Sequence, residues 1–140
     1  MYKKTLPPLS PEFCSLKEMF MKPQFIIGAA SSGSGKTTFT MGLLRALAHR
    51  GMRVQPYKCG PDYIDTQFHS LASKQVSVNL DTWLASEEHV RSLYHSYGKD
   101  ADVCTVEGVM GLYDGYSGMK GSSAAMAALL DIPVILLVNA

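Results

Sequence analysis

Apolar residues along this chain fall into two kinds of segment: short continuous runs, and longer stretches in which apolar side chains recur every three or four residues. The short runs are typical of strands buried on both faces, and the longer stretches are typical of helices. Strands are therefore expected at residues 24–30, 52–59, 101–108 and 132–140, and helices at 36–51, from near Gln67 to residue 75, at 86–98 and at 121–131. Because strands alternate with helices, the pattern predicts an α/β fold built on a parallel sheet flanked by helices.

Local signals add detail to three of these elements. Ser86 can cap the helix at 86–98, and the two acidic residues that follow it complement the positive end of the helix dipole. Pro56 has no N–H to donate, so it is expected to weaken the strand at 52–59 or to place it at a sheet edge. The strand at 132–140 is apolar throughout, and it is expected near the centre of the sheet.

Residues 1–23 follow neither the helical nor the strand period. We expect this segment to be a disordered or non-native lead-in. The chain stops directly after the last expected strand, with no helix to cover it. Residues 24–140 are therefore expected to be the N-terminal part of a larger domain, with a sheet that is incomplete at the C-terminus.

Composition and charge are those of an ordinary globular domain, with 46% hydrophobic and 18% charged residues. The formal net charge of +1 gives no general attraction to nucleic acid or to an anionic membrane, and neither is expected as a partner. No apolar run approaches the roughly 20 residues that cross a bilayer. The three cysteines form no CxxC pair, so neither a disulfide framework nor a zinc site is suggested, and a reducing, cytoplasmic location is expected.

The strongest motif is "ASSGSGKT", residues 30–37, between an expected strand and an expected helix. It satisfies the phosphate-binding pattern G-x-x-x-x-G-K-[ST] except at Ala30, which costs little if its backbone suits a non-glycine residue. Lys36 can reach the β- and γ-phosphates, and the Thr37 hydroxyl can bind Mg²⁺. The motif predicts that ATP or GTP is bound by Ser32, Gly33, Ser34, Gly35, Lys36, Thr37 and Thr38.

Carboxylates follow the next two expected strands. Asp62 and Asp65 come after the second strand, where they can hold Mg²⁺ or a reacting group, or can simply stabilise a turn. Glu107 ends the third strand, and Asp114 follows it in a glycine-rich loop. Because the carboxyl ends of parallel strands share one edge of a sheet, these carboxylates and Lys36 favour phosphoryl transfer.

Other residues with reactive side chains indicate no further site. No spacing typical of a metal centre is present, so the histidines are expected in solvent: His49, His69, His89 and His95. Cys59 and Cys104 are expected to be small packing residues. Trp83 is expected to anchor the connection into the helix at 86–98.

Four motifs together resemble one family. "GSGKTT" (33–38), "GPDYID" (60–65), "NLDTW" (79–83) and "EGVMGLYDG" (107–115) stand in the order and spacing seen in cobyrinate a,c-diamide synthases. The family has a dethiobiotin-synthetase-like, P-loop NTPase-like α/β domain followed by a glutamine amidotransferase domain. The resemblance, which covers residues 25–140, implies that residues 24–140 are the N-terminal part of the ATP-binding synthetase domain and that the amidotransferase domain is absent.

The resemblance implies ATP- and Mg²⁺-dependent amidation of the a and c carboxylates of cobyrinate or hydrogenobyrinate in cobalamin biosynthesis. The γ-phosphate would pass to a substrate carboxylate, and ammonia released from glutamine would attack the acyl phosphate. Catalytic roles would fall to Lys36, Asp62, Asp65 and Asp114, and Mg²⁺ binding to Thr37, Asp62 and Glu107. Tyr63 and Ile64 would lie near the corrin. The exact tetrapyrrole and the oligomeric state, a homodimer included, are left open.

Two other functions on a similar fold also stay open. Dethiobiotin synthetase activates a carboxylate too, but the pair of motifs "GPDYID" and "EGVMGLYDG" argues against it. Nucleotide-switch ATPases often carry an additional lysine early in the phosphate-binding loop. Ser31 occupies that place here, which counts against this second function.

Overall fold

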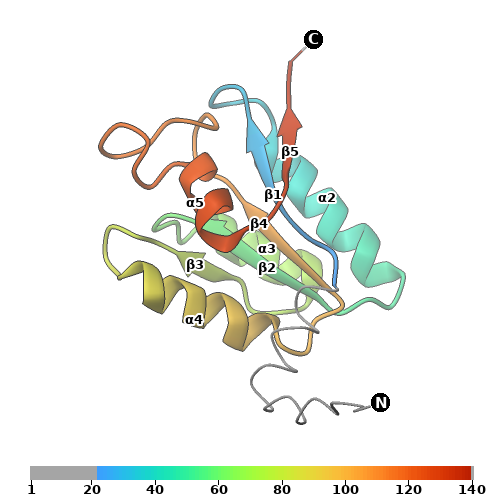
Figure 1. Ribbon diagram of the computed structural model, residues 1–140. Coiled ribbons are helices and arrows are strands. Elements are labelled where there is room, and N and C mark those ends of the chain that lie inside the picture. The colour runs from blue at the N-terminus through green and yellow to red at the C-terminus, as the bar shows by residue number, and fades with distance from the viewer. Residues whose placement is uncertain (1–21, 140) are drawn as a thin grey trace, which may run out of the picture.

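The computed structural model describes residues 22–139, so the expected lead-in at 1–23 lies almost wholly outside the described residues. Helices and strands alternate along the described chain, as the hydrophobic pattern predicts (Figure 1). The elements are β1 (Gln24–Ala29), α2 (Lys36–His49), β2 (Val54–Cys59), α3 (Asp65–Ser73), β3 (Val78–Leu80), α4 (Glu87–Gly98), β4 (Val103–Glu107), α5 (Ser123–Leu130) and β5 (Val134–Leu137).

All five strands join one parallel sheet in the order β3-β2-β4-β1-β5. Helices α4 and α5 lie on one face of this sheet, and α2 and α3 lie on the other (Figure 1). The predicted α/β class, a parallel sheet flanked by helices, is therefore confirmed.

Each face of the sheet has its own apolar core. On the α4 and α5 side, Tyr57 and Tyr94 pack with ring centroids 4.8 Å apart, and the Tyr57 hydroxyl donates to the Tyr94 carbonyl oxygen at 2.6 Å. On the α2 and α3 side, Leu44 is fully buried against Val54 and Val103. Strands β2 and β4 are buried along their whole length, and the polar residues that they contain, such as Lys58 and Glu107, are buried with them.

Three expectations about the sheet differ from the structure. A short strand, β3, overlaps the start of the "NLDTW" segment and was not predicted, because three residues are too few to show a period. The strand with Pro56 is interior, between β3 and β4, and not at an edge. Since β3 pairs only from Tyr57 onward, Pro56 itself has a paired strand on one side alone, which accommodates its missing N–H.

The third difference concerns β5, which is the last strand of the described sheet and not a central one. Its apolar residues Val134, Ile135 and Leu136 are each more than a third exposed. The continuous apolar run correctly indicated a strand, but a run of this kind carries no information about what lies on the strand's outer side.

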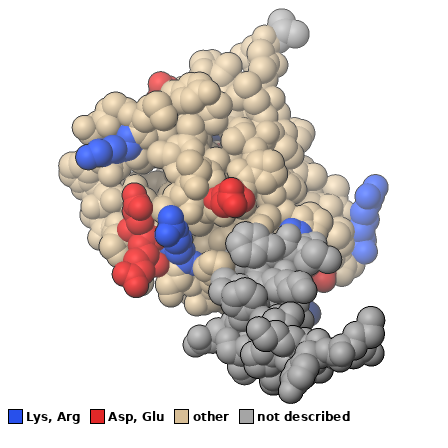
Figure 2. All heavy atoms as spheres, viewed as in Figure 1, with Lys and Arg blue, Asp and Glu red and all other residues tan. Residues whose placement is uncertain are grey.

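Helix ends follow the expected local chemistry. Ser86 caps α4 by accepting a hydrogen bond from the His89 N–H, as predicted, and Ser122 caps α5 through the Ala125 N–H. No helix in residues 22–139 is long and apolar enough to cross a membrane. On the face shown in Figure 2, charged side chains stand in small groups of both signs on a mostly uncharged surface.

Candidate active site

The loop between β1 and α2 leads the chain from the sheet into a helix N-terminus. Gly33 and Gly35 adopt left-handed backbone conformations with φ of 77° and 81°, which only glycine adopts without strain. Ala30 is not among the residues with positive φ, so alanine fits at the first position of the motif, as expected. Among the described residues no side chain caps α2 at Gly35, and its first N–H groups face the loop where an anion can bind.

Lys36 is the first residue of α2 and is 8% exposed. Its Nζ donates to the carbonyl oxygen of Met110, 2.5 Å away in the loop after β4. Met110 has a φ of 44°, an uncommon conformation for a non-glycine residue. Burial, together with the nearby Lys58 ammonium, lowers the pKa of Lys36. The loop after β4 therefore holds the Lys36 ammonium through a backbone carbonyl.

Beside this lysine, four polar side chains from four different elements meet below the loop. Thr37 Oγ1 donates to Glu107 Oε1 at 2.8 Å and to Asp65 Oδ2 at 3.3 Å. Lys58 Nζ forms ion pairs with the same two oxygens, at 2.9 Å and 2.8 Å. These four residues, Thr37, Lys58, Asp65 and Glu107, are called the carboxylate cluster below. The parallel sheet produces it by bringing the ends of β2 and β4 next to the start of α2 and α3.

Glu107 is the centre of this cluster and is completely buried. Its second oxygen, Oε2, accepts a hydrogen bond from Nε2 of His69 at 2.6 Å. Burial favours the neutral acid, but His69 and Lys58 outweigh it and lower the pKa of Glu107 to about 2. Lys58 shows the matching effect, since its two carboxylate partners overcome burial and raise its pKa. The Lys58 ammonium and the Glu107 carboxylate therefore stabilise each other in their charged forms.

Two of the predicted carboxylates lie near the cluster but hold loops in place. Asp62 Oδ1 accepts the N–H groups of Ile64 and Asp65 at 2.9 Å and 3.0 Å, which fixes the entry into α3. Burial alone would raise the pKa of Asp62, but these N–H groups and Lys58 lower it. Asp114 Oδ2 accepts the Gly111 N–H at 3.0 Å and closes the turn after Met110. Asp65, and not Asp62, shares the hydrogen bonds of Thr37.

The remaining predicted residues lie at the surface of the same edge. Tyr63 and Ile64 are 76% and 68% exposed, directly before α3. Ser32, Gly33, Gly35 and Thr38 of the loop are exposed, and Ser34 is half-buried with its hydroxyl donating to the Ser31 carbonyl. The structure thus brings together every residue predicted from the motifs along one edge of the sheet.

The oxygens of the cluster suit Mg²⁺, which prefers hydroxyl and carboxylate ligands. One hydroxyl and two carboxylates, from Thr37, Asp65 and Glu107, converge within hydrogen-bonding distance of one another. The two carboxylates already share a single cation, the Lys58 ammonium. Among the described residues no group of three or more His, Cys, Asp or Glu side chains forms a metal site by itself, so the hydroxyl and a nucleotide phosphate would have to complete the coordination.

Sequence reasoning missed Lys58 and was wrong about His69. The structure buries His69 completely, on the Glu107 carboxylate, whereas solvent exposure was expected. Two signals could have found these residues: Lys58 is a lone cation in a buried strand, and His69 lies four positions after Asp65, hence on the same helix face. Cys59 and Cys104 are buried, as expected.

Fold and site together define the class: a phosphate-binding loop at the carboxyl edge of a parallel sheet, with acidic residues and a hydroxyl beside it, is a P-loop nucleotide-binding domain. The chain belongs to the family described as "CobQ/CobB/MinD/ParA nucleotide binding domain", whose profile matches residues 25–138.

Three similar proteins are cobyrinate or hydrogenobyrinate a,c-diamide synthases. A cobyrinate a,c-diamide synthase of Dehalococcoides mccartyi (strain CBDB1) is 52% identical over 119 residues, covering 84% of this chain and 26% of the relative. One from Streptococcus sanguinis (strain SK36) is 52% identical over 83% of this chain and 26% of the relative. A hydrogenobyrinate a,c-diamide synthase of Streptomyces coelicolor is 49% identical over 84% of this chain and 25% of the relative. The chain thus spans about a quarter of the length of these relatives.

A solved structure gives a weaker likeness. Chloroplast FtsY from Physcomitrella patens matches 82% of this chain and 40% of its own, with a TM-score of 0.48 and 16% sequence identity.

Proposed function

We propose that this domain binds ATP with Mg²⁺ and passes the γ-phosphoryl group to a carboxylate of a corrin. Ammonia then displaces phosphate from the acyl phosphate to give the amide. The observation that carries the proposal is the placement of the carboxylate cluster directly beside the phosphate-binding loop. The corrin is proposed because the relatives are cobyrinate and hydrogenobyrinate a,c-diamide synthases, of which this chain matches about a quarter.

In this proposal the chain's residues mainly hold and neutralise charge. The N–H groups from Gly33 to Thr37 hold the phosphates, and Lys36 leaves the Met110 carbonyl for the β- and γ-phosphates. Thr37, Asp65 and Glu107 would hold Mg²⁺, which neutralises charge on the transferring group when it is bound. His69 keeps the Glu107 carboxylate oriented from behind.

The substrate carboxylate attacks the γ-phosphorus, and ADP leaves with the bond electrons. Asp62 and Asp114 are assigned to positioning, because each fixes a loop that borders the cluster. Tyr63 and Ile64 are assigned to the corrin, since they are exposed between the cluster and solvent. We propose that the ammonia comes from glutamine hydrolysed by a separate amidotransferase domain.

The test isolates phosphoryl transfer from the supply of ammonia. The chain is incubated with ATP, Mg²⁺, cobyrinate and hydroxylamine, which converts an acyl phosphate into a stable hydroxamate. We expect cobyrinate-dependent ADP release with an equal amount of hydroxamate. Lys36→Ala should lower both by about a hundredfold, the usual cost of removing a charge-stabilising donor.

The matched control is Lys99→Ala, an exposed lysine that follows α4, which should leave both products unchanged. ADP release that does not depend on cobyrinate would contradict the proposed substrate. Normal hydroxamate formation by Lys36→Ala would contradict the assignment of the loop.

A further inference from the structure

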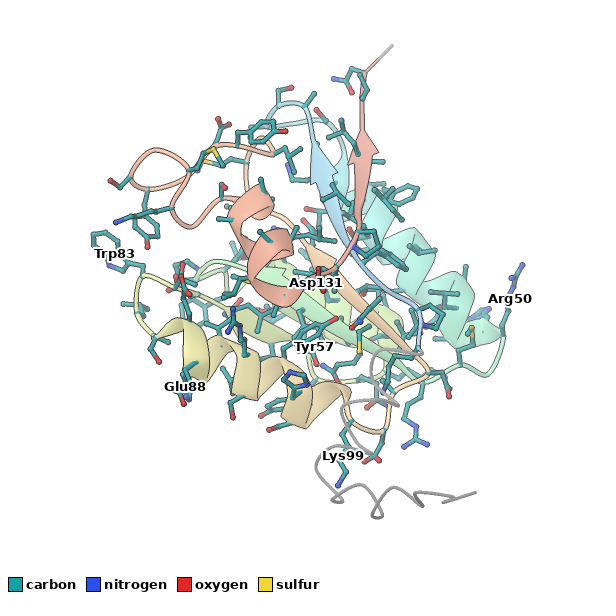
Figure 3. The ribbon with its side chains drawn as sticks, in the orientation of Figure 1. Arg50, Tyr57, Trp83, Glu88, Lys99 and Asp131 are labelled. Atoms are coloured by element: carbon teal, nitrogen blue, oxygen red, sulfur yellow. The ribbon has the colours of Figure 1, made fainter. Side chains whose placement is uncertain are left out.

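A second surface stands at the same sheet edge, outside the carboxylate cluster. It consists of Trp83, in the connection from β3 to α4, and Tyr116, in the loop from β4 to α5. Their rings meet edge to face with centroids 4.8 Å apart, and they are 67% and 46% exposed. Trp83 was expected to anchor the start of α4, but its ring contacts a different loop and faces solvent. Figure 3 shows Trp83 at the outer end of the β3–α4 connection, beside the β4–α5 loop.

Local contacts hold the backbone on both sides of this aromatic pair. Asp81 Oδ1 accepts a hydrogen bond from the backbone N–H of Trp83 at 2.9 Å. Gly121, with a φ of 74°, lies so close under the Tyr116 ring that any side chain there would collide with it. The Tyr116 N–H donates to the Lys120 carbonyl at 3.0 Å, which closes a tight turn. Two exposed aromatic rings in contact with each other form a contiguous apolar patch, and such a patch on loops at the site edge suits ligand binding.

A cavity of about 270 Å³ adjoins the pair. Tyr116, Met126 and Leu129 give it apolar walls, and Lys120 and Glu87 supply one charge of each sign. Such a mixture of apolar walls and few polar groups is typical of small-molecule sites. Gly121, which also lines the cavity, accepts a hydrogen bond from the Cys59 thiol at 3.9 Å, so this loop contacts the end of β2.

We propose that the Trp83–Tyr116 pair binds the flat face of the corrin ring and that Lys120 binds one of its peripheral carboxylates. This inference rests on the proposed function and assigns residues that the motif roles leave unused. A corrin is a broad, partly conjugated ring edged with carboxylates, so it offers a flat face to aromatic rings and negative charge to a lysine. The pair and the carboxylate cluster both lie in segments that follow strand ends at the carboxyl edge of the sheet, so this inference places the corrin at the edge that also carries Lys36.

The chain contains a single tryptophan, so its fluorescence reports on Trp83 alone. Cobyrinate is titrated into the protein, with N-acetyltryptophanamide as the control for light absorbed by the corrin. Binding is measured in parallel by equilibrium dialysis, followed by the visible absorbance of the corrin. We expect saturable quenching of Trp83 with the same midpoint as the dialysis curve.

Variants separate ring contact from structural support. Tyr116→Ala should weaken cobyrinate binding roughly tenfold, as removal of one stacked aromatic ring does elsewhere, and Tyr116→Phe should bind normally. Lys120→Gln should weaken binding several-fold, and Lys99→Gln, at the other end of α4, is the matched control (Figure 3). Trp83→Phe keeps a ring and should bind nearly as well as the parent by dialysis.

The outcomes distinguish this inference from the proposed function. Cobyrinate that binds by dialysis without quenching Trp83, or that binds Tyr116→Ala as tightly as the parent, overturns the aromatic site and leaves the corrin substrate standing. No binding in dialysis overturns both. If Tyr116→Ala loses its circular dichroism spectrum, the quenching result and Lys120→Gln decide the question.

Discussion

Two glycine-rich loops border the candidate site, and each contains a pair of glycines that is required for a different reason. In the β1–α2 loop, a side chain added at Gly33 or Gly35 meets nothing within 4 Å, but the backbone φ of both residues is strongly positive. In the β4–α5 loop, Gly108 and Gly115 have ordinary φ values, but an added side chain would collide with neighbouring atoms, including backbone carbonyl oxygens. Gly33 and Gly35 are thus required for backbone conformation, whereas Gly108 and Gly115 are required for close packing.

This difference between the glycines reflects different roles for the two loops. The β1–α2 loop keeps open space around its N–H groups, as a loop that surrounds a ligand must. The β4–α5 loop is packed against the end of the sheet, where it positions the Met110 carbonyl for Lys36 and the Tyr116 ring for Trp83. The first loop therefore leaves space for a ligand, whereas the second packs against the sheet and holds side chains in position at the site.

The largest expected effect follows from crowding. Gly108→Ala places a methyl group against the Ser123 side chain and 2.9 Å from the Ile27 carbonyl oxygen, neither of which can move without disturbing β1 or α5. We expect the free energy of unfolding to fall by about 3 kcal/mol, the upper range for overpacking. Urea denaturation followed by circular dichroism measures this, and a loss no larger than that of Gly35→Ala would erase the distinction between the loops.

The next largest expected effect is a loss of stability at acidic pH, and it involves Glu107, the residue directly before the β4–α5 loop. The pKa of Glu107 is lowered in the folded chain, from 4.5 to about 2, so its stabilising contribution is complete above pH 4.5 and is lost as pH falls. Between pH 4.5 and about pH 3, this loss amounts to about 2 kcal/mol.

Comparison with Glu107→Gln isolates this contribution, because the amide does not titrate. We expect the stability difference between parent and variant, measured in urea at a series of pH values, to shrink by that amount on acidification. A difference that stays constant from pH 6 to pH 3 would show that Glu107 is not held ionised by Lys58 and His69.

The smallest expected effect on stability is that of a substitution in the β1–α2 loop. Gly35→Ala has room for its methyl group but forces alanine to a φ of 81°, for which we expect a loss of about 1 kcal/mol. The matched control is Gly42→Ala, also uncrowded but inside α2 with no positive φ, where alanine should stabilise by up to about 1 kcal/mol. Equal effects of the two substitutions would mean that conformation does not explain Gly35.

Much of this arrangement could be predicted from the sequence. Buried strands and amphipathic helices leave strong periodic signals, and the glycines, Lys36 and Thr37 of the phosphate-binding loop have a fixed spacing. The carboxyl ends of parallel strands meet by topology, so the alternation of strands and helices alone places Asp65 and Glu107 near the loop.

The unpredicted parts depend on contacts between distant residues. Lys58 and His69 lie 49 and 38 positions from Glu107, and no local pattern links them to it. The Trp83–Tyr116 contact also joins two loops that are separate in sequence. Pro56 is tolerated in an interior strand because the pairing with β3 begins only at Tyr57, and a three-residue strand gives no sequence signal of where it starts. Pairings of this kind are set by the whole fold, so one sequence read along its length does not reveal them.

The Lys58 ammonium has a further consequence for ion binding. Many small metal-binding domains fold only when the ion arrives, because their carboxylates or thiolates repel each other without it. Here an internal cation already pairs with both Asp65 and Glu107, which reduces their mutual repulsion without a metal. A divalent ion that binds these oxygens must compete with Lys58 for them. The net affinity of such an ion is therefore the gain from its own contacts minus the loss of the Lys58 ion pairs. We expect the ion to bind weakly and to exchange readily until a nucleotide phosphate adds its own negative charge.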